Sequence, residues 1–328
     1  MQSFAQVGGR DAMRALPRQL PVVAAAFTVA VLAAGLSFAA AWATAPGVGD
    51  LASRVAQRER ATGARPIPLS AVAPVMREAV VATEDERFWR HDGVDAIGIL
   101  RAIPYDLGHL SLAQGASTID EQLAKLLYLG GNDHNPWAKL RDAAIALRMD
   151  ARYAKARILG DYLNTVYFGA GAYGVQAASR RYFGLPAARL SLAQASLLAG
   201  LIQAPGADDP YRHALAARER QAVALTSMVR NGFVTEGEAR RALARPLPLA
   251  RGKALPPLRG VSLDPGPPFY WGELGLGAAL AALGALGIAA MRRAARPRRR
   301  LPRLAARAAP VIATATGLLL ALGSVRGV

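Results

Sequence analysis

The chain has 328 residues, a formal net charge of +17, four histidines and no cysteine. It can therefore form neither a disulfide framework nor a thiolate metal site, and because the histidines are not spaced as metal ligands, the sequence assigns no metal ligand. The positive charge would suit nucleic acid, but seven arginines lie within residues 292–303, between two apolar runs. Basic residues beside apolar runs indicate membrane topology, so we expect a membrane and no nucleic acid as a partner.

The first apolar run, residues 20–44, predicts a transmembrane anchor. It follows a basic N-terminal segment, residues 1–19, and is long enough to cross a bilayer at about 1.5 Å per residue. A cleaved signal peptide is the alternative, because Ala43-Thr44-Ala45 resembles a cleavage site. Since basic residues stay on the cytoplasmic side, the anchor predicts a cytoplasmic N-terminus and an external domain after it.

Two further runs, residues 274–291 and 305–324, predict a transmembrane hairpin around the basic loop at 292–303. The arginines of this loop place it in the cytoplasm, and the C-terminus then lies outside. Residues 246–271 precede the hairpin and are rich in proline, which predicts an extended linker.

Residues 50–245 are predicted to form a compact all-α domain, because alanine and leucine are frequent and helix caps recur. Overlapping capping boxes at Ser117 and Thr118 predict a helix over Gln122–Leu129. An apolar face over Ile158–Val166 predicts a second helix, and Ser191 with Gln194 predicts the start of a third.

The segment Val81–Gly93 carries the strongest chemical signal of this domain. On a helix, Glu84, Phe88 and His91 would lie on one stripe, so a carboxylate, a ring and an imidazole would form a wall of a site. A solvated acidic turn beside a helix is the ordinary alternative for an isolated Glu-Asp pair.

Five ordered motifs resemble those of the peptidoglycan glycosyltransferases, glycosyltransferase family 51. The stretch Thr83–Phe88 with His91 and Gly93 resembles the first signature. The second to fifth signatures are matched, in order, by Gly115–Lys125, Lys139–Asp142, Lys155–Asn164 and Arg220–Met228. The resemblance covers roughly residues 67–240. Each motif alone is weak, but their order and spacing together favour membership of this family.

The resemblance implies a lysozyme-like helical domain on the periplasmic side of a bacterial inner membrane. Such a domain polymerises lipid II into β-1,4-linked glycan with inversion and releases undecaprenyl pyrophosphate. Its implied partners are lipid II, the growing glycan strand, the membrane and other cell-wall synthesis proteins. We expect a monofunctional enzyme, because no serine–lysine transpeptidase signature follows the fifth motif.

The resemblance also implies residue roles. Glu84 takes the place of the catalytic base that accepts the proton of the acceptor's 4-hydroxyl, and Asp142 takes the place of a second glutamate, shorter here by one methylene or about 1.5 Å. The lysines, or a Mg²⁺ or Mn²⁺ ion, would neutralise the leaving pyrophosphate. The implied substrate-binding residues are Asp85, Phe88, His91, Ser117, Thr118, Glu121, Gln122, Lys125, Lys139 and Lys155.

Several positions depart from the family pattern, and these departures keep two alternatives open. Glu121 replaces a glutamine, Leu126 an asparagine, Ala138 an arginine and Gly160 a glutamate. They favour a catalytically silent relative that acts as a scaffold through its C-terminal hairpin. A lysozyme-like hydrolase using Glu84 as an acid is the other alternative, disfavoured because the lysines have no task on an uncharged bond. The apolar residues 96–112 suit either a segment that dips into the bilayer or a core segment.

Overall fold

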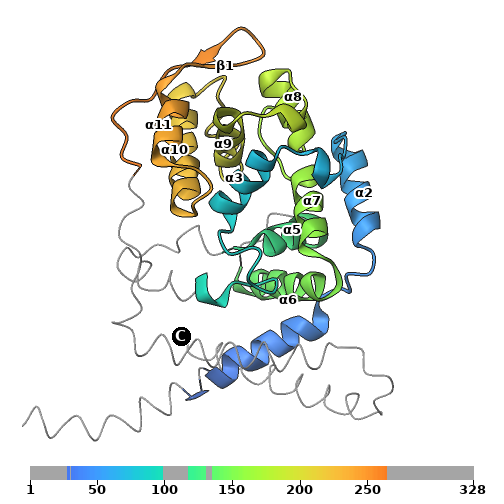
Figure 1. Cartoon of the computed structure of the whole chain (residues 1–328). Coiled ribbons are helices and arrows are strands. Elements are labelled where there is room, and N and C mark those ends of the chain that lie inside the picture. The colour runs from blue at the N-terminus through green and yellow to red at the C-terminus, as the bar shows by residue number, and fades with distance from the viewer. Residues whose placement is uncertain (1–27, 30, 99–116, 131–134, 264–328) are drawn as a thin grey trace, which may run out of the picture. The chain divides into compact units, whose positions relative to one another are not determined.

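The computed structural model describes residues 28–29, 31–98, 117–130 and 135–263 (Figure 1). The N-terminal unit contains a helix over residues 31–44, and a separate unit, the body, begins at Pro46. Among the described residues, no helix combines the length and the apolar character that crossing a bilayer requires. The predicted spans at 274–291 and 305–324, with their loop, lie outside the described residues, as do parts of 20–44 and most of 96–112.

The described body is predominantly helical, which confirms the all-α class for this part of the chain. Its secondary-structure elements are α2 (Leu51–Thr62), η1 (Leu69–Ala71), α3 (Pro74–Glu84), α5 (Ile119–Tyr128), α6 (Pro136–Arg152), α7 (Lys155–Thr165), α8 (Val175–Phe183), η2 (Ala187–Arg189), α9 (Leu192–Leu201), α10 (Ala214–Arg230), α11 (Glu236–Ala244), β1 (Leu247–Pro248) and β2 (Ala254–Leu255). The strands form one short antiparallel ribbon.

Helix α9 is the centre of one half of the body. It is apolar on all sides, and its residues from Ala195 to Leu201 are buried, which is the pattern of a helix enclosed by others. Helices α3 and α10 both pack against it. Since α3 ends at Glu84, this core fixes the position of that carboxylate.

Helices α5, α6 and α7 form the other half, and α5 packs against both of the others (Figure 1). Helix α5 begins after Thr118, whose hydroxyl accepts from Glu121 N–H while the Glu121 carboxylate accepts from Thr118 N–H. The Thr118 capping box is therefore confirmed, and the helix starts three residues earlier than predicted. The box predicted at Ser117 does not form the cap, because the N-cap residue is Thr118.

Two further predictions were wrong in the described region. Helix α3 stops at Glu84, so Phe88 and His91 lie on a turn and not on a helical stripe. In addition, residues 247–255 form the β1–β2 ribbon in place of an extended linker, because Leu247 and Leu255 are buried against the body. Composition alone could not show that leucines in a proline-rich segment have a core to enter.

Candidate active site

The site is organised around Glu84 at the end of α3. Gln122 on α5 donates from Nε2 to Glu84 Oε2 at 2.8 Å, and the Tyr162 hydroxyl on α7 donates to Gln122 Oε1 at 2.8 Å. Burial raises the pKa of Glu84 to about 7, an effect that the Gln122 hydrogen bond and Arg220 oppose and Asp85 reinforces. A carboxylate that titrates near neutral pH, held by a hydrogen bond, is suited to act as a general base.

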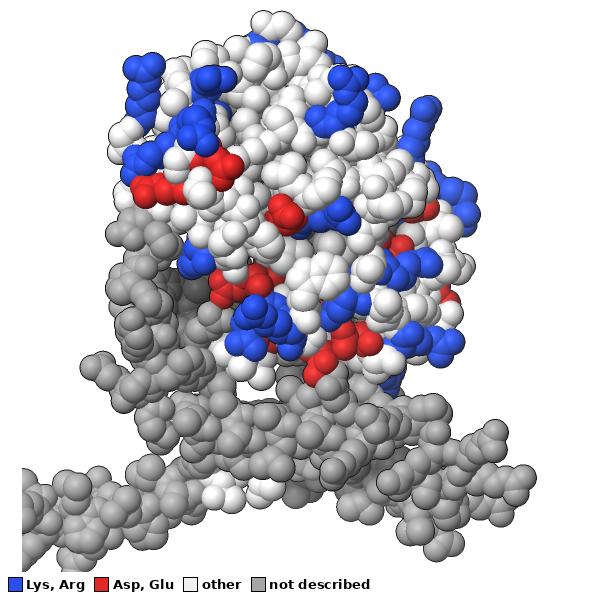
Figure 2. All heavy atoms as spheres, viewed as in Figure 1, with Lys and Arg blue, Asp and Glu red and all other residues white. Residues whose placement is uncertain are grey.

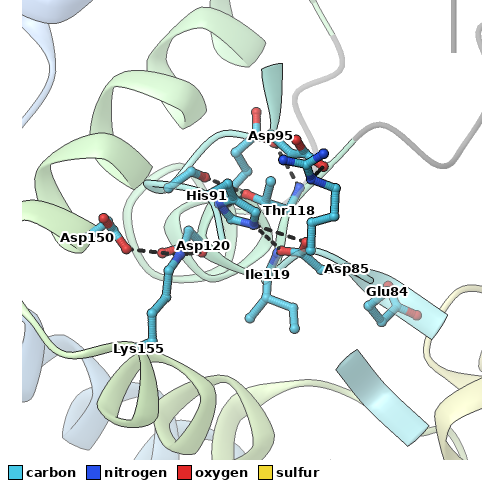
Figure 3. Close-up of polar contacts among 12 residues, drawn as sticks. Glu84, Asp85, His91, Asp95, Thr118, Ile119, Asp120, Asp150 and Lys155 are labelled. Atoms are coloured by element: carbon cyan, nitrogen blue, oxygen red, sulfur yellow. Dashed lines mark hydrogen bonds and ion pairs between the residues drawn. The ribbon is translucent and has the colours of Figure 1, made fainter. Parts of the chain in front are cut away.

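Asp85 and His91 pair with each other beside Glu84. His91 Nε2 lies 2.9 Å and 3.0 Å from the two Asp85 carboxylate oxygens, and Ile119 N–H donates to Asp85 Oδ2 at 3.0 Å. Both side chains are buried, as is Phe88. Figure 3 shows Glu84 set apart from the dashed contacts of this pair. Asp85, Phe88 and His91 therefore form a buried wall next to Glu84, in which the Asp85 carboxylate and His91 Nε2 bind each other.

Lys155 belongs to a partly buried ion-pair network that the sequence analysis missed. Its Nζ atom lies 2.9 Å from Asp120 Oδ2 and 2.9 Å from Asp150 Oδ1, and 4.6 Å from the centroid of the Phe88 ring. Asp120 is fully buried, and burial raises its pKa to about 6 while Lys155 lowers it. Lys155 thus has two carboxylate partners inside the body, which separates it from the other predicted phosphate-binding lysines.

Asp120 also lies close to the pair formed by Asp85 and His91. Each of the three residues has one atom that could bind a metal ion, and these atoms all lie within 4.8 Å of one another. Because His91 already binds Asp85 and the ammonium group of Lys155 already binds Asp120, we interpret this group as an ion-pair network and not as a metal site (Figure 3). The sequence offered one sign of the role of Asp120, its place in the first turn of a helix, and an acidic residue there ordinarily indicates an interaction with the helix N-terminus.

The start of α5 and the first turn of α6 bring together the remaining predicted residues. Lys139 Nζ lies 2.7 Å from Ser117 Oγ and 3.1 Å from Glu121 Oε1. The Thr118 hydroxyl donates to Gly93 O at 2.6 Å and so ties the first motif to the second. The Lys139 side chain is 46% exposed, and Lys125 is also partly exposed. These two lysines therefore remain accessible to an anionic group.

Asp142, one turn further along α6, is buried, and its Oδ1 atom has no hydrogen-bond partner among the described residues. Burial raises its pKa to about 6, with Lys139 and Lys125 lowering it and Glu121 raising it. Asp142 thus shares its electrostatic surroundings with both lysines. Figure 2 shows the same intermixing on the visible face of the body, where acidic side chains lie beside basic ones.

Comparison with known proteins places these residues in a family context. The family described as Transglycosylase matches residues 51–229. The chain is 42% identical over 177 residues to penicillin-binding protein 1B of Vibrio cholerae, covering 53% of this chain and 23% of that protein. It is 37% identical over 190 residues to penicillin-binding protein 1A of Escherichia coli, covering 57% of this chain and 22% of that protein.

A shorter relative is covered over most of its length. A Cupriavidus necator protein whose name gives it as a transglycosylase is 41% identical over 183 residues, which is 56% of this chain and 78% of that protein. Among solved structures, penicillin-binding protein 1A from Haemophilus influenzae matches 30% of this chain and 15% of that chain, at 32% identity and a TM-score of 0.29. The chain spans less than a quarter of the two penicillin-binding proteins named above.

Proposed function

The chain belongs to the transglycosylase family, and from that premise we propose that it is a peptidoglycan glycosyltransferase. It would polymerise lipid II into β-1,4-linked glycan with inversion and release undecaprenyl pyrophosphate. The observation that carries the proposal is Glu84: its carboxylate is held by Gln122 at 2.8 Å, and its pKa is raised to about 7. The proposal covers glycosyl transfer alone and extends to none of the other activities of the larger relatives.

Glu84 would act as the general base of the transfer. Gln122 holds Oε2, and Oε1 has no hydrogen-bond partner within the described part of the chain. The free oxygen accepts the proton of the acceptor's 4-hydroxyl as that oxygen bonds to the donor's anomeric carbon. The bond from this carbon to the pyrophosphate breaks on the opposite face, so the product has inverted configuration. A base with a pKa near neutral is largely ionised at slightly alkaline pH and still accepts a proton readily.

Lys125 and Lys139 would neutralise the departing pyrophosphate, because both are partly exposed and both face the Asp142 region. Fixed positive charges near a leaving group stabilise the charge that develops on it. Lys155 is assigned a different task. Asp120 and Asp150 each lie 2.9 Å from its ammonium group, which is also 4.6 Å from the centroid of the Phe88 ring, so Lys155 would support the wall next to Glu84.

The requirement for Mg²⁺ or Mn²⁺ stays a prediction. Such ions favour carboxylate oxygens that are free to bind them. Glu121 offers none, because Lys139 binds Oε1 and Thr118 N–H binds Oε2. The positive charge that offsets Glu121 therefore comes from Lys139, and we derive no step through a cation. Comparing polymerisation with and without EDTA tests the requirement directly.

The finer features of the family resemblance belong to the same proposal. We propose a lysozyme-like arrangement of the helices and a location at the inner membrane, with the body on the periplasmic side. Residues 20–44 and the hairpin at 274–324 would anchor it there. Their apolar character supports this, as does the arginine-rich loop between the two C-terminal runs.

The test is polymerisation of labelled lipid II by the purified full chain, with Glu84→Gln as the matched inactive variant. We expect glycan from the wild type and a loss of about 10²- to 10⁴-fold in the variant, the usual contribution of a general base. Release of soluble fragments from finished glycan would instead support the hydrolase. A folded wild-type protein that does neither would support the catalytically silent scaffold. The observation that favours this alternative is the ion pair between Lys139 and Glu121, which engages a lysine that the reaction would need.

A further inference from the structure

We infer that Tyr162 is a positioning residue for the general base, because its hydroxyl determines which end of the Gln122 amide faces Glu84. This inference rests on the function proposed above. It gives Gln122, predicted to bind substrate, the role of a link between two helices and the base. Tyr162 itself carries no role in the sequence analysis.

The hydrogen bonds of the three residues agree with only one orientation of the amide. Tyr162 is fully buried, and its hydroxyl donates to Gln122 Oε1 at 2.8 Å. An amide oxygen only accepts, so the opposite end of the group, Nε2, must face Glu84 Oε2. In the reverse orientation, the oxygen of Gln122 would face the Glu84 carboxylate, and the Tyr162 O–H would lose its acceptor. A buried donor without an acceptor is costly, so the tyrosine favours the observed orientation.

The three residues come from three different helices, so their alignment depends on packing. Helix α7 is held by buried apolar residues on the face that also carries Tyr162, among them Ile158, Leu159 and Leu163. Helix α5 packs against α7 and carries Gln122. The result is a chain of hydrogen bonds from Tyr162 to Gln122 to Glu84, in which the outer residue acts only through the middle one.

Few other groups within the described residues act on Glu84. Asp85, at the end of the same helix, raises its pKa, whereas Arg220 on α10 lowers it. Tyr162 is the titratable side chain that faces it from α7, and α9, which packs against α3, has no titratable residue. Within the part of the chain that the structure describes, the Gln122 amide is thus the one neutral donor bonded directly to the carboxylate, and its orientation decides whether the ionised form is stabilised.

Removal of the Tyr162 hydroxyl should therefore change the titration of Glu84. In Tyr162→Phe the Gln122 amide can rotate, and its oxygen then accepts from protonated Glu84, which stabilises the acid over the carboxylate. The pKa of Glu84 should rise by about one unit. The acid limb of the pH profile of kcat/KM should move to higher pH by the same amount. At a pH below this limb, kcat/KM should be about tenfold lower than in the wild type, and above it the two proteins should have similar values.

Tyr182→Phe is the matched control. Tyr182 is also fully buried, and its hydroxyl donates to Phe168 O at 3.0 Å, away from Glu84. Both substitutions delete one buried hydroxyl and keep the ring. If Tyr162 has only a structural role, the two variants should both lose stability and neither should shift the pH profile.

The experiment records kcat/KM for lipid II against pH and the Glu84 carboxyl titration by ¹³C NMR, using full-length protein with labelled glutamate and Glu84→Gln for assignment. We expect both readouts to shift in Tyr162→Phe, neither in Tyr182→Phe, and no additional shift when Tyr162→Phe is added to Gln122→Leu. An unshifted titration in a folded Tyr162→Phe variant, or an equal shift in the Gln122→Leu background, would overturn the inference. Because the NMR titration needs no turnover, an inactive wild type would refute only the proposed function.

Discussion

The Lys139 ammonium group lies 3.1 Å from the Glu121 carboxylate, across the contact between α5 and α6. The same carboxylate caps α5 through Thr118 N–H at 2.9 Å. One side chain therefore both starts a helix and draws on the charge of a lysine that we assign to the leaving group. Substitution can separate these two effects.

Glu121→Gln should keep the cap and release Lys139, because glutamine serves equally in a capping box but carries no charge. Since Lys139 is 46% exposed, solvent weakens the ion pair, and we expect kcat/KM for lipid II to rise only about two- to fivefold. The matched control is Glu238→Gln, which alters the Thr235–Glu238 capping box of α11. Equal effects of the two variants would show that capping, and not the release of Lys139, is responsible.

Glu84→Gln should stabilise the fold at alkaline pH while it lowers activity about 10²- to 10⁴-fold. Burial raises the pKa of Glu84 from 4.5 to about 7, so the folded protein keeps a proton that the unfolded chain has released. The stability from this proton is complete below about pH 4.5 and is lost as the pH rises through about 7. At about pH 8 the variant should gain on the order of 1–3 kcal/mol in free energy of unfolding.

Chemical denaturation of Glu84→Gln and wild type at about pH 5 and pH 8 measures this difference. The gain should be small at the lower pH, where wild-type Glu84 is largely protonated in the folded state. A gain that does not depend on pH would show that the ionisation of Glu84 is not its cause. Glu78→Gln, on the same helix, provides the control for loss of a carboxylate elsewhere on α3.

Asp142 should matter to the rate if its carboxylate takes part in the reaction. Asp142→Ala should lower kcat by about 10²-fold, whereas Asp142→Glu should raise it, because the added methylene extends the carboxylate by about 1.5 Å. Its buried Oδ1 atom, which has no partner among the described residues, is consistent with a group that is not committed to the fold. If neither substitution changes lipid II turnover, Asp142 has no part in catalysis.

The membrane topology is open to a direct test. We expect the N-terminus in the cytoplasm, residues 46–272 outside it, residues 292–303 in the cytoplasm and the C-terminus outside, because the arginines gather on one side of the predicted spans. Reporter fusions after residues 45, 272, 297 and 328 give the location of each segment. A cytoplasmic C-terminus would contradict the hairpin.

Sequence alone was sufficient for two helices of the body whose signals are local. The capping box at Thr118 and the apolar face of α7 depend on residues three or four positions apart, so the helices they indicate are present with shifts of a few residues. Glu84 was indicated as the candidate base by the resemblance of its motif to a known family, which is also read along the chain. Neighbours along one helix interact regardless of what the rest of the chain does.

Tertiary structure decided the partners of these groups. Helix α3 ends at Glu84, and the next residue, Asp85, accepts from Ile119 N–H, 34 positions away. Lys155 lies against Asp120 instead of an open phosphate site, and the orientation of Gln122 depends on Tyr162, 40 positions away. Each contact joins elements that meet only once the helices pack, and burial then favours pairing, because an unpaired polar group in the core is costly.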